Sequence, residues 1–544
     1  MAATSPTTAA PIRAPPCPGI NRVSLPFCRR RPRRAAPSTR CSRKGEPAVT
    51  DVVQEEAPRS PETQGKDGEE EEEEAAAQRG ALGCLRIDGV AVDILSIAVP
   101  AVLALAADPI TTLVDTAFVG HIGSAQLAAV GASASVFNLV SKLFNVPLLN
   151  VTTSFVAEQQ AVVDDSSNSI GQRDDFLMPQ KKASQQRKIL PAVSTSLALA
   201  AGIGLLEMVA LVVGSGTLMD IIGIPVDSPM RAPAEQFLTL RAYGAPPIIV
   251  ALAAQGAFRG FLDTKTPLYA VGAGNLLNAI LDAVLIFPLG LGVSGAALAT
   301  VSSEYLTALI LLWKLNNEVD LFSWNIIGDG IIRYLQSGGL LIGRTIAVLL
   351  TMTLSTSLAA REGPVPMAAY EICLQVWLTI SLLNDALALA GQALLASEYA
   401  KRNYKQARMV LYRVLQVGGV TGVALAATLF IGFGSLSLLF TDDPAVLDIA
   451  QSGVWFVTIS QPVNAIAFVA DGLYYGVSDF AYAAYSTLFA SAISSVFLLI
   501  AAPKFGLGGI WAGLTLFMSL RAVACFWRLG SKGGPWEIIW SESE

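Results

Sequence analysis

The chain has 544 residues, of which 53% are hydrophobic and only 15% charged, and its formal net charge is −6. Soluble proteins typically carry about 25% charged residues. Here apolar runs, each long enough to cross a bilayer as a helix, recur between residues 92 and 530. A soluble multi-domain enzyme is therefore nearly excluded. The single histidine also excludes a metal site with several histidine ligands.

The amino-terminal region has the composition of an organelle address. Residues 1–45 hold ten Lys and Arg and no Asp or Glu, as transit peptides do. Prolines from residue 6 to residue 18 interrupt any amphipathic helix, which favours a plastid over a mitochondrial address. Residues 46–74 then carry twelve acidic and two basic side chains. Such a stretch cannot bury a core, so we expect an acidic disordered spacer over residues 46–90.

About twelve membrane helices are predicted in the body of the chain. The even number places both termini on one side of the membrane. Lys and Arg gather in the segments 161–188 and 398–413, and the positive-inside rule predicts that these face the stroma together with the termini. The predicted spans are 92–118, 127–158, 189–213, 237–261, 266–288, 293–314, 333–358, 367–397, 407–431, 453–476, 480–501 and 507–528.

An internal repeat divides this body into two halves. A shift of 216 residues superposes Pro246 on Pro462, Gly256 on Gly472 and Asp263 on Asp479. A shift of 240 superposes the second span on the eighth. The fold class predicted is an all-α membrane protein with two parallel six-helix lobes, residues 91–320 and 321–530, followed by a tail over 531–544. Secondary transporters are commonly built this way, with the substrate between the halves.

Acidic residues inside the predicted spans distinguish the first half from the second. Asp115 corresponds to Ser355, and Asp282 corresponds to Leu498. Asn278 lies four residues before Asp282, on the same helix face. An acid buried in a membrane bundle is costly and marks an ion or proton path. Two neighbouring buried acids are natural proton carriers, and with the Asn278 oxygen they offer ligands to a hard cation such as Na⁺. The structural alternative is that these acids cap helices or bond to Ser and Thr.

Further polar residues within the spans are candidates for the lining of a cavity. Hydrogen bonding between helices explains them equally well. We also expect an ion pair between Arg344 and Asp385, and kinks at Pro246–Pro247 and Pro462. The cavity candidates are Gln255, Gln375, Asp385, Gln392, Gln461, Asn464, Asp471 and Arg344.

Three stretches together resemble the multidrug and toxic compound extrusion (MATE) transporters over about residues 90–530. The long acid-poor address and the stretch from Asp385 to Glu398 resemble the plastid-type DETOXIFICATION branch of the plant family, within the DinF-like subgroup. The stretches are Pro100 with Val114-Asp115-Thr116 through Gly120-His121-Ile122-Gly123, then Gln255-Gly256 through Arg259-Gly260 to Asp263-Thr264-Lys265-Thr266-Pro267, and Ala390-Gly391-Gln392-Ala393-Leu394.

The resemblance implies two lobes that form a V and antiport driven by a cation. It also implies that Asp115, Asn278 and Asp282 bind the coupling cation. Related branches carry an essential Glu in the seventh helix, where this chain has apolar residues around Ala347 and Val348. A second cation site of that kind is therefore in doubt, in agreement with the asymmetry between the halves.

The predicted function is a cation-coupled, expected proton-coupled, antiporter that exports small organic solutes across a plastid envelope membrane. We expect no enzyme activity, no cofactor besides the coupling H⁺ or Na⁺, no nucleic-acid partner, contact with membrane lipid, and a monomer.

Two alternatives remain open. A flippase for lipid-linked substrates favours a cavity with several basic residues, and Arg344 is nearly alone among the residues considered. An intramembrane prenyl-transferring enzyme needs an acid-rich Mg²⁺ motif, and Asp164-Asp165 and Asp442-Asp443 lack its third acid.

Overall fold

A computed structural model describes residues 89–174, 189–222, 224–321, 329–438, 440–441 and 443–541. These residues are almost entirely helical, which confirms the all-α fold class. The predicted transit peptide and nearly all of the acidic spacer lie outside the described residues.

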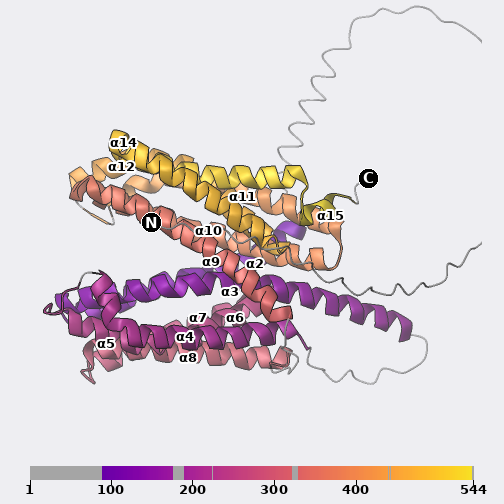
Figure 1. The fold of residues 1–544 in the computed structure, drawn as a ribbon, viewed down its shortest axis with the longest axis horizontal. Helices are drawn as coiled ribbons and strands as arrows, with labels where there is room; N and C mark the ends of the chain where they lie inside the picture. Colours follow the sequence, from indigo (N-terminus) through magenta and orange to yellow (C-terminus); the bar gives the residue numbers. More distant parts are fainter. Residues whose placement is uncertain are drawn as a thin grey trace, which may run out of the picture. The chain divides into compact units, whose positions relative to one another are not determined.

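The helices form two consecutive groups, which can be followed in Figure 1 by their labels. The first group, called the first lobe, ends with α8, and the second lobe begins with α9. The first lobe contains α2 (Gly89–Gly120), α3 (Ser124–Asp174), α4 (Pro191–Ile222), α5 (Arg231–Ala242), α6 (Ala245–Gly260), α7 (Lys265–Ile286) and α8 (Gly292–Glu318). The second lobe contains α9 (Asp329–Arg361), α10 (Pro364–Ala400), α11 (Tyr404–Ser437), α12 (Pro444–Ile459), α13 (Gln461–Gly476), α14 (Phe480–Ser531) and the short α15 (Pro535–Ser541).

The helix lengths agree with twelve membrane passes. Within the described residues, nine helices are long and apolar enough to span a membrane, and the bent pairs α5–α6 and α12–α13 bring the number to eleven. The 52-residue α14 is far longer than one crossing needs. Its backbone leaves helical geometry at Gly506, with φ 55° and ψ −135°, so α14 makes two passes.

Both kinks predicted at prolines are complete helix breaks. The axes of α5 and α6 differ by 45°, and those of α12 and α13 by 50°. Prolines occupy the first turn of α6 and of α13. Proline lacks an N–H donor, and the first turn of a helix is where that donor is not needed. Each proline therefore starts a new helix. The earlier halves, α5 and α12, also begin before the predicted spans 237–261 and 453–476.

Helix α3 is longer than predicted (Figure 1). It continues to Asp174, whereas the sequence prediction ended this span at residue 158. The extension is rich in polar residues that are compatible with helix outside a bilayer. One stabilising contact is the hydrogen bond of 2.9 Å that Gln160 Nε2 donates to Asp164 Oδ2 one turn later.

The internal repeat is visible in the packing of the helices. A Cβ atom on Gly256 would lie 2.9 Å from the Leu149 carbonyl oxygen, so α6 approaches α3 closely there. Gly472, its partner under the 216-residue shift, meets the Ala388 backbone of α10 even more closely. Likewise, Gly204 on α4 faces the Pro246 backbone, and Gly422 on α11 faces the Pro462 backbone. In both lobes, glycines therefore allow corresponding helices to approach each other closely.

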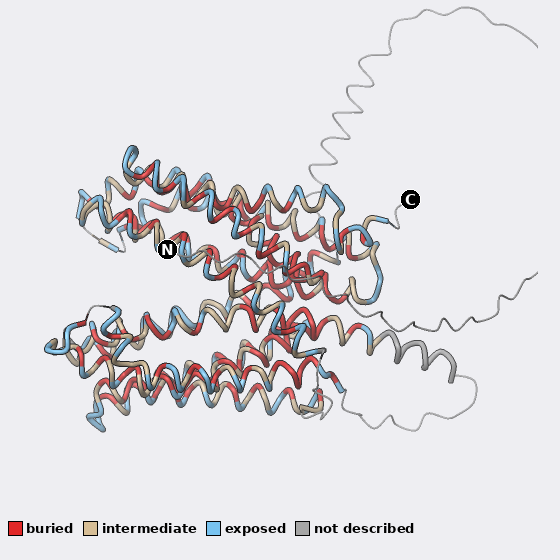
Figure 2. The backbone as a smooth tube through the Cα atoms, in the orientation of Figure 1, coloured by how far each residue is buried: buried red, intermediate tan, exposed pale blue. Residues whose placement is uncertain are grey.

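The two lobes are joined near one set of helix ends. Ser154 Oγ on α3 donates a hydrogen bond of 2.7 Å to the Tyr475 carbonyl on α13. Arg333 on α9 pairs with Glu158 on α3 at 2.9 Å. One apolar cluster at this end includes Phe155 of the first lobe and residues of α9, α10 and α13. Figure 2 shows the buried segments concentrated where the groups meet.

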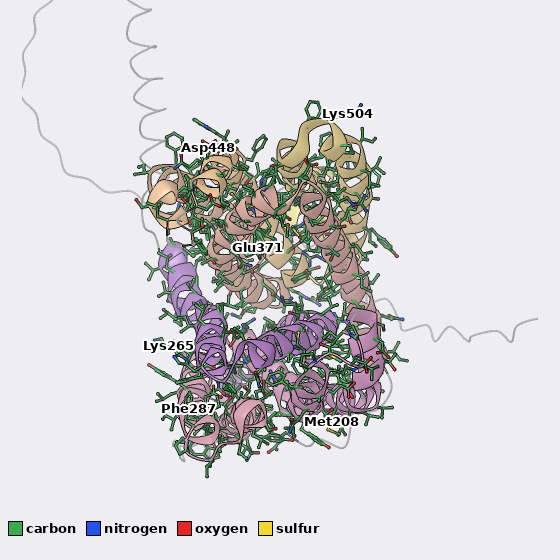
Figure 3. The ribbon with its side chains drawn as sticks, turned by 90° about the vertical axis from the view of Figure 1, so that its left-hand side faces the viewer. Met208, Lys265, Phe287, Glu371, Asp448 and Lys504 are labelled. Carbon is green, nitrogen blue, oxygen red and sulfur yellow. The ribbon has the colours of Figure 1, made fainter. Side chains whose placement is uncertain are left out.

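At the opposite helix ends, the described apolar clusters stay within one lobe. Phe237 and Ile286 belong to a first-lobe cluster, and Trp377 and Trp511 to a second-lobe cluster. Figure 3 views the helices from this end, with Phe287 in the first lobe and Lys504 in the second. The connection between the lobes is therefore concentrated at the end where α3 terminates and where α10 turns into α11.

Candidate cation site and charged clusters

The three residues predicted to bind the coupling cation lie together in the first lobe. Asn278 Nδ2 on α7 donates a hydrogen bond of 2.6 Å to Asp115 Oδ1 on α2 and a longer one of 3.4 Å to Asp282 Oδ2. The carboxyl groups of Asp115 and Asp282 are also within hydrogen-bonding reach of each other. Asn278 and Asp282 are fully buried, and Asp115 is half-buried.

Local sequence sets the orientation of α7. Asp263 Oδ1 accepts hydrogen bonds from the backbone amides of Lys265 and Thr266, at 3.0 and 3.1 Å, and so caps the start of the helix. Gly274, Asn278 and Asp282 follow at intervals of four residues on one buried face. The polar pair is therefore held inside the lobe.

This cluster has unused capacity to bind a cation. Two carboxyl groups can share a hydrogen bond only when one of them carries a proton. Asn278 Oδ1 and Asp282 Oδ1 are buried acceptors without a hydrogen-bond partner. Buried acceptors without partners are costly. A proton or a small cation at this position would satisfy them.

Sequence reasoning missed a second group of charged residues in the first lobe. Arg241 at the end of α5 forms an ion pair of 2.5 Å with Glu304 on α8. Glu207 on α4 is buried and accepts a hydrogen bond from Ser141. These acids lie in predicted spans, so the rule that selected Asp282, an acid inside an apolar run, would have found them.

The second lobe contains a cluster in which Asp471 on α13 binds two arginines. Asp471 Oδ2 pairs with Arg344 on α9 and, at 2.5 Å, with Arg521 on α14. The expected partner of Arg344 was Asp385, and that prediction is wrong. Asp385 on α10 is exposed and interacts only at longer range with Arg344, Arg521 and the buried Arg259. Arg344 is therefore not isolated. Arg259 on α6, Arg344 on α9 and Arg521 on α14 all interact with Asp385.

Gln392 connects the lobes. Its Nε2 on α10 donates hydrogen bonds of 2.9 Å to the Asn150 carbonyl and to Ser154 Oγ on α3. Hydrogen bonding between helices thus explains Gln392 better than the lining of a cavity does.

Two other candidates lie at the α12–α13 break. Gln461 donates to the Val457 carbonyl at 3.0 Å, and Asn464 donates to Ser460 Oγ at 3.2 Å. Both are buried. Gln461 thereby satisfies a backbone carbonyl beside the break, and Asn464 binds a side chain at the break.

The remaining two candidates are separated as well. Gln255 is half-buried on α6. Gln375 on α10 is exposed, donates to Glu371 at 2.7 Å and, with it, lines a hollow of about 320 Å³ in the second lobe. Figure 3 labels Glu371 in that lobe. The eight candidates therefore do not form one cavity.

Comparison with known proteins identifies the class of this molecule. The profile of the MatE family matches residues 181–284 and 341–500. Protein DETOXIFICATION 44, chloroplastic, of Arabidopsis thaliana is 64% identical over 84% of this chain and 86% of its own length. Protein DETOXIFICATION 45, chloroplastic, from the same plant is 47% identical over 82% of this chain and 79% of its own length. DNA damage-inducible protein F of Escherichia coli is 24% identical over 81% of this chain and 92% of its own length.

Solved structures share the fold. The crystal structure of MATE in the bent conformation matches with a TM-score of 0.73 and 19% identity, over 84% of this chain and 97% of that chain. The two-lobe helical architecture predicted from the repeat is thereby confirmed.

The fold and the relatives define a multi-pass membrane transporter of the cation-coupled efflux type, not an enzyme. The chain belongs to the MATE family, on the plastid branch whose DinF-like relatives it resembles. It is a plastid membrane protein that moves small organic solutes. Neither the flippase nor the prenyl-transferring enzyme is favoured.

Proposed function

We propose that the chain is a proton-coupled antiporter that exports small organic solutes across a plastid envelope membrane. Asp115, Asn278 and Asp282 hold the coupling proton. The observation that carries this proposal is that the Asn278 amide bridges the carboxyl groups of Asp115 and Asp282 beside two unpartnered buried acceptor oxygens. A shared proton completes this arrangement directly, whereas a hard metal cation would need several more oxygen ligands.

The proposed cycle follows from the connection between the lobes. Because they are joined at one end, solute enters and leaves the space between the opposite helix ends in this state. Protonation of the Asp115–Asp282 pair removes a negative charge from the first lobe, which changes the packing of α2 against α7 and lowers the affinity for solute. Coupling requires that proton and solute favour different states. The clustered Lys and Arg residues favour stromal termini, and the protein acts as a lipid-embedded monomer.

Transport in proteoliposomes tests the proton site. The full chain is reconstituted, an imposed pH gradient is applied, and dissipation of that gradient is followed for a panel of organic anions, cations and neutral phenolics. We expect Asp115→Asn and Asp282→Asn each to lower solute-dependent exchange by at least about 100-fold, because neither variant can release the shared proton. Asp93→Asn is the matched control, since Asp93 is an exposed acid on the same helix α2.

A Na⁺ gradient at constant pH separates the two candidate ions. Exchange driven by the pH gradient alone supports proton coupling, and exchange driven by Na⁺ alone contradicts it. Retention of full exchange in both Asp→Asn variants shows that the site is elsewhere.

A further inference from the structure

The ion pair between Arg241 and Glu304 is unusually well formed for the interior of a membrane lobe. Arg241 Nη1 donates to Glu304 Oε2 at 2.6 Å, and Nη2 lies 2.5 Å from Oε1, so the contact is bidentate. The two side chains are 13% and 15% exposed. The guanidinium carbon lies 4.2 Å from the centre of the Phe137 ring, which supports it from α3.

The surroundings of Arg241 are rich in acids. Phe237 on α5, Val119 on α2 and Ile286 on α7 pack in one apolar cluster, so α5 lies beside the two helices of the coupling site. The charge of Arg241 there acts on Asp108 and Asp115 on α2, Glu207 on α4 and Glu304 on α8. Asp282 on α7 joins this group through its contact with Asp115. Four carboxyl groups thus interact with one guanidinium, and Asp282 neighbours one of the four. Protons or other cations must neutralise most of the remaining charge, because unpaired charges inside a bilayer are costly. Two tyrosines also lie at this break: Tyr305 on α8 donates a hydrogen bond to the carbonyl of Tyr243, the residue that follows α5.

The pair lies at the break between α5 and α6. Gly244 directly precedes α6, and a Cβ atom there would collide with the Glu304 carboxylate and lie 2.6 Å from Arg241 Nη1. The missing side chain therefore makes room for the ion pair. Arg241 also lies in the last turn of α5, where a cation interacts favourably with the helix dipole.

The second lobe has no equivalent of this pair. Under the 216-residue shift, Arg241 corresponds to Val457 and Glu304 to Leu520, although both lobes have the helix break. The pair thus occurs in the same lobe as Asp115 and Asp282 and is missing from the repeat that lacks them. This coincidence links the ion pair to the cation site rather than to the break itself.

We propose that Arg241 is a counter-ion shared by Glu304 and the coupling site, and that this sharing sets the proton affinity of Asp115 and Asp282. The proposal rests on their proposed role as the proton site. While the acids share a proton, Arg241 pairs with Glu304. When the proton leaves to water, Asp115 and Asp282 carry two negative charges. Asp115 then draws Arg241 away from Glu304, which loosens the end of α5 from α8. Arg241 and Glu304 are positioning residues in this scheme.

The direction in which two substitutions shift the protonation midpoint of the site tests the electrostatic part of the proposal. Infrared spectroscopy of the reconstituted full chain detects protonated carboxyl groups without any solute, and the band that Asp115→Asn and Asp282→Asn remove belongs to the site. Glu304→Gln leaves Arg241 unpaired, which favours the ionised acids, so the midpoint of this band should fall by about one pH unit, a tenfold change in proton affinity. Arg241→Gln leaves the Glu304 charge uncompensated, so the midpoint should rise by a similar amount.

Further variants separate this effect from loss of structure. The double variant Arg241→Gln with Glu304→Gln should return toward the wild-type midpoint, because both charges are absent. Arg241→Lys keeps the positive charge and should shift the midpoint less than Arg241→Gln. Glu398→Gln is the control, because it removes the exposed Lys401–Glu398 pair at the end of α10 and should shift nothing. If Arg241→Gln does not fold, Glu304→Gln and Arg241→Lys carry the test.

Hydrogen exchange tests the movement of Arg241. The amide of Gly244 donates to the Arg241 carbonyl at 2.9 Å. Its protection factor should fall as the pH rises through the site's midpoint in the wild type, and should stay constant in Asp115→Asn. The amide of Ser460, at the second-lobe break, is the internal control.

Shifts of the same sign in Glu304→Gln and Arg241→Gln, or no shift, overturn the proposal. Constant protection of Gly244 in the wild type overturns the exchange of partners. Neither result touches the proton site, which fails separately if Asp115→Asn and Asp282→Asn leave the carboxyl band and the transport unchanged.

Discussion

Glycine 472 shows how much the packing of one lobe depends on a single missing side chain. A Cβ atom at this position would meet the Ala388 backbone of α10, and backbone cannot move aside as a flexible side chain can. Gly419 on α11, by contrast, has nothing within 4 Å of its hypothetical Cβ. The two glycines are both helical but differ in what they face.

We therefore expect Gly472→Ala to destabilise the protein and Gly419→Ala not to. Overpacking a tight contact costs about 1–3 kcal/mol, whereas alanine in an open helical position is favoured by up to about 1 kcal/mol. Thermal unfolding in detergent should give a lower midpoint for Gly472→Ala and an equal or higher one for Gly419→Ala. Equal midpoints for both variants would contradict the close approach of α13 and α10.

At the residue scale, the sequence predicts the members of the cation site but not their counter-charges. Asn278 and Asp282 can be found because polar residues four apart in an apolar run share a face. Their contact with Asp115 was expected from the family resemblance and from the cost of burying an acid. The partner of Arg344 was predicted incorrectly, because Asp385 and Asp471 are both acids in apolar spans. The rotation of α10 and α13 around their axes decides between them, and no local pattern encodes it.

At the scale of the elements, the repeat predicts equivalent positions that the structure uses differently. Asp263 and Asp479 each precede a helix at the same place in the repeat. Asp263 caps α7 through backbone amides. Asp479 instead accepts hydrogen bonds from Arg528 at 2.9 Å and from Trp536 Nε1 at 3.2 Å. It thereby holds α15 against the bundle, although the sequence predicted a simple tail over 531–544.

We expect Asp479→Ala to release α15. Trp536 is fully buried, and without Asp479 its indole N–H would lose its acceptor while Arg528 would lose its counter-ion. Limited proteolysis should then cut residues 535–541 at least about tenfold faster than in the wild type. Asp263→Ala is the matched control, since it removes an equivalent acid that does not touch α15. An unchanged cleavage rate in Asp479→Ala would show that apolar packing alone holds the helix.

The spans themselves were predictable because hydropathy reports the bilayer directly. The predicted span boundaries are wrong where a factor other than hydropathy determines where a helix starts or ends. Proline chemistry converts one kinked span into α5 and α6 and another into α12 and α13, and α3 continues through polar residues beyond the apolar run. A hydropathy pattern measures neither the geometry of a helix start nor helix stability outside the membrane.

At the scale of the whole molecule, transport requires the contacts between the lobes to be reversible. These contacts combine an apolar cluster shared by both lobes with a few polar contacts: hydrogen bonds from Gln392 to α3, one from Ser154 to Tyr475, and the partly exposed Arg333–Glu158 pair. An exposed ion pair contributes at most about 1 kcal/mol. A change of access requires that the apolar and the polar contacts can both separate. The sequence left this role of Gln392 open, since hydrogen bonding between helices and the lining of a cavity explained it equally well.

Chemical cross-linking between the lobes provides the corresponding test. Gln392 Nε2 and Ser154 Oγ lie 2.9 Å apart, so the double variant Ser154→Cys with Gln392→Cys brings two thiols within reach of a short bifunctional thiol reagent. We expect the reagent to cross-link the double variant and to reduce solute exchange in proteoliposomes to background, because the joined ends can no longer separate. A reagent joined through a disulfide allows a reducing agent to restore exchange.

The single variants treated in the same way separate cross-linking from simple modification. Each carries only one of the two new thiols. Cys373 and Cys525 are buried, and the four cysteines outside the described residues are replaced by serine in every variant, so exchange should continue. If the cross-linked double variant still exchanges solute, the lobes need not part at this end, and the path of the solute does not run between them. Loss of exchange that the reductant reverses would instead establish that α3 and α10 separate in every transport cycle.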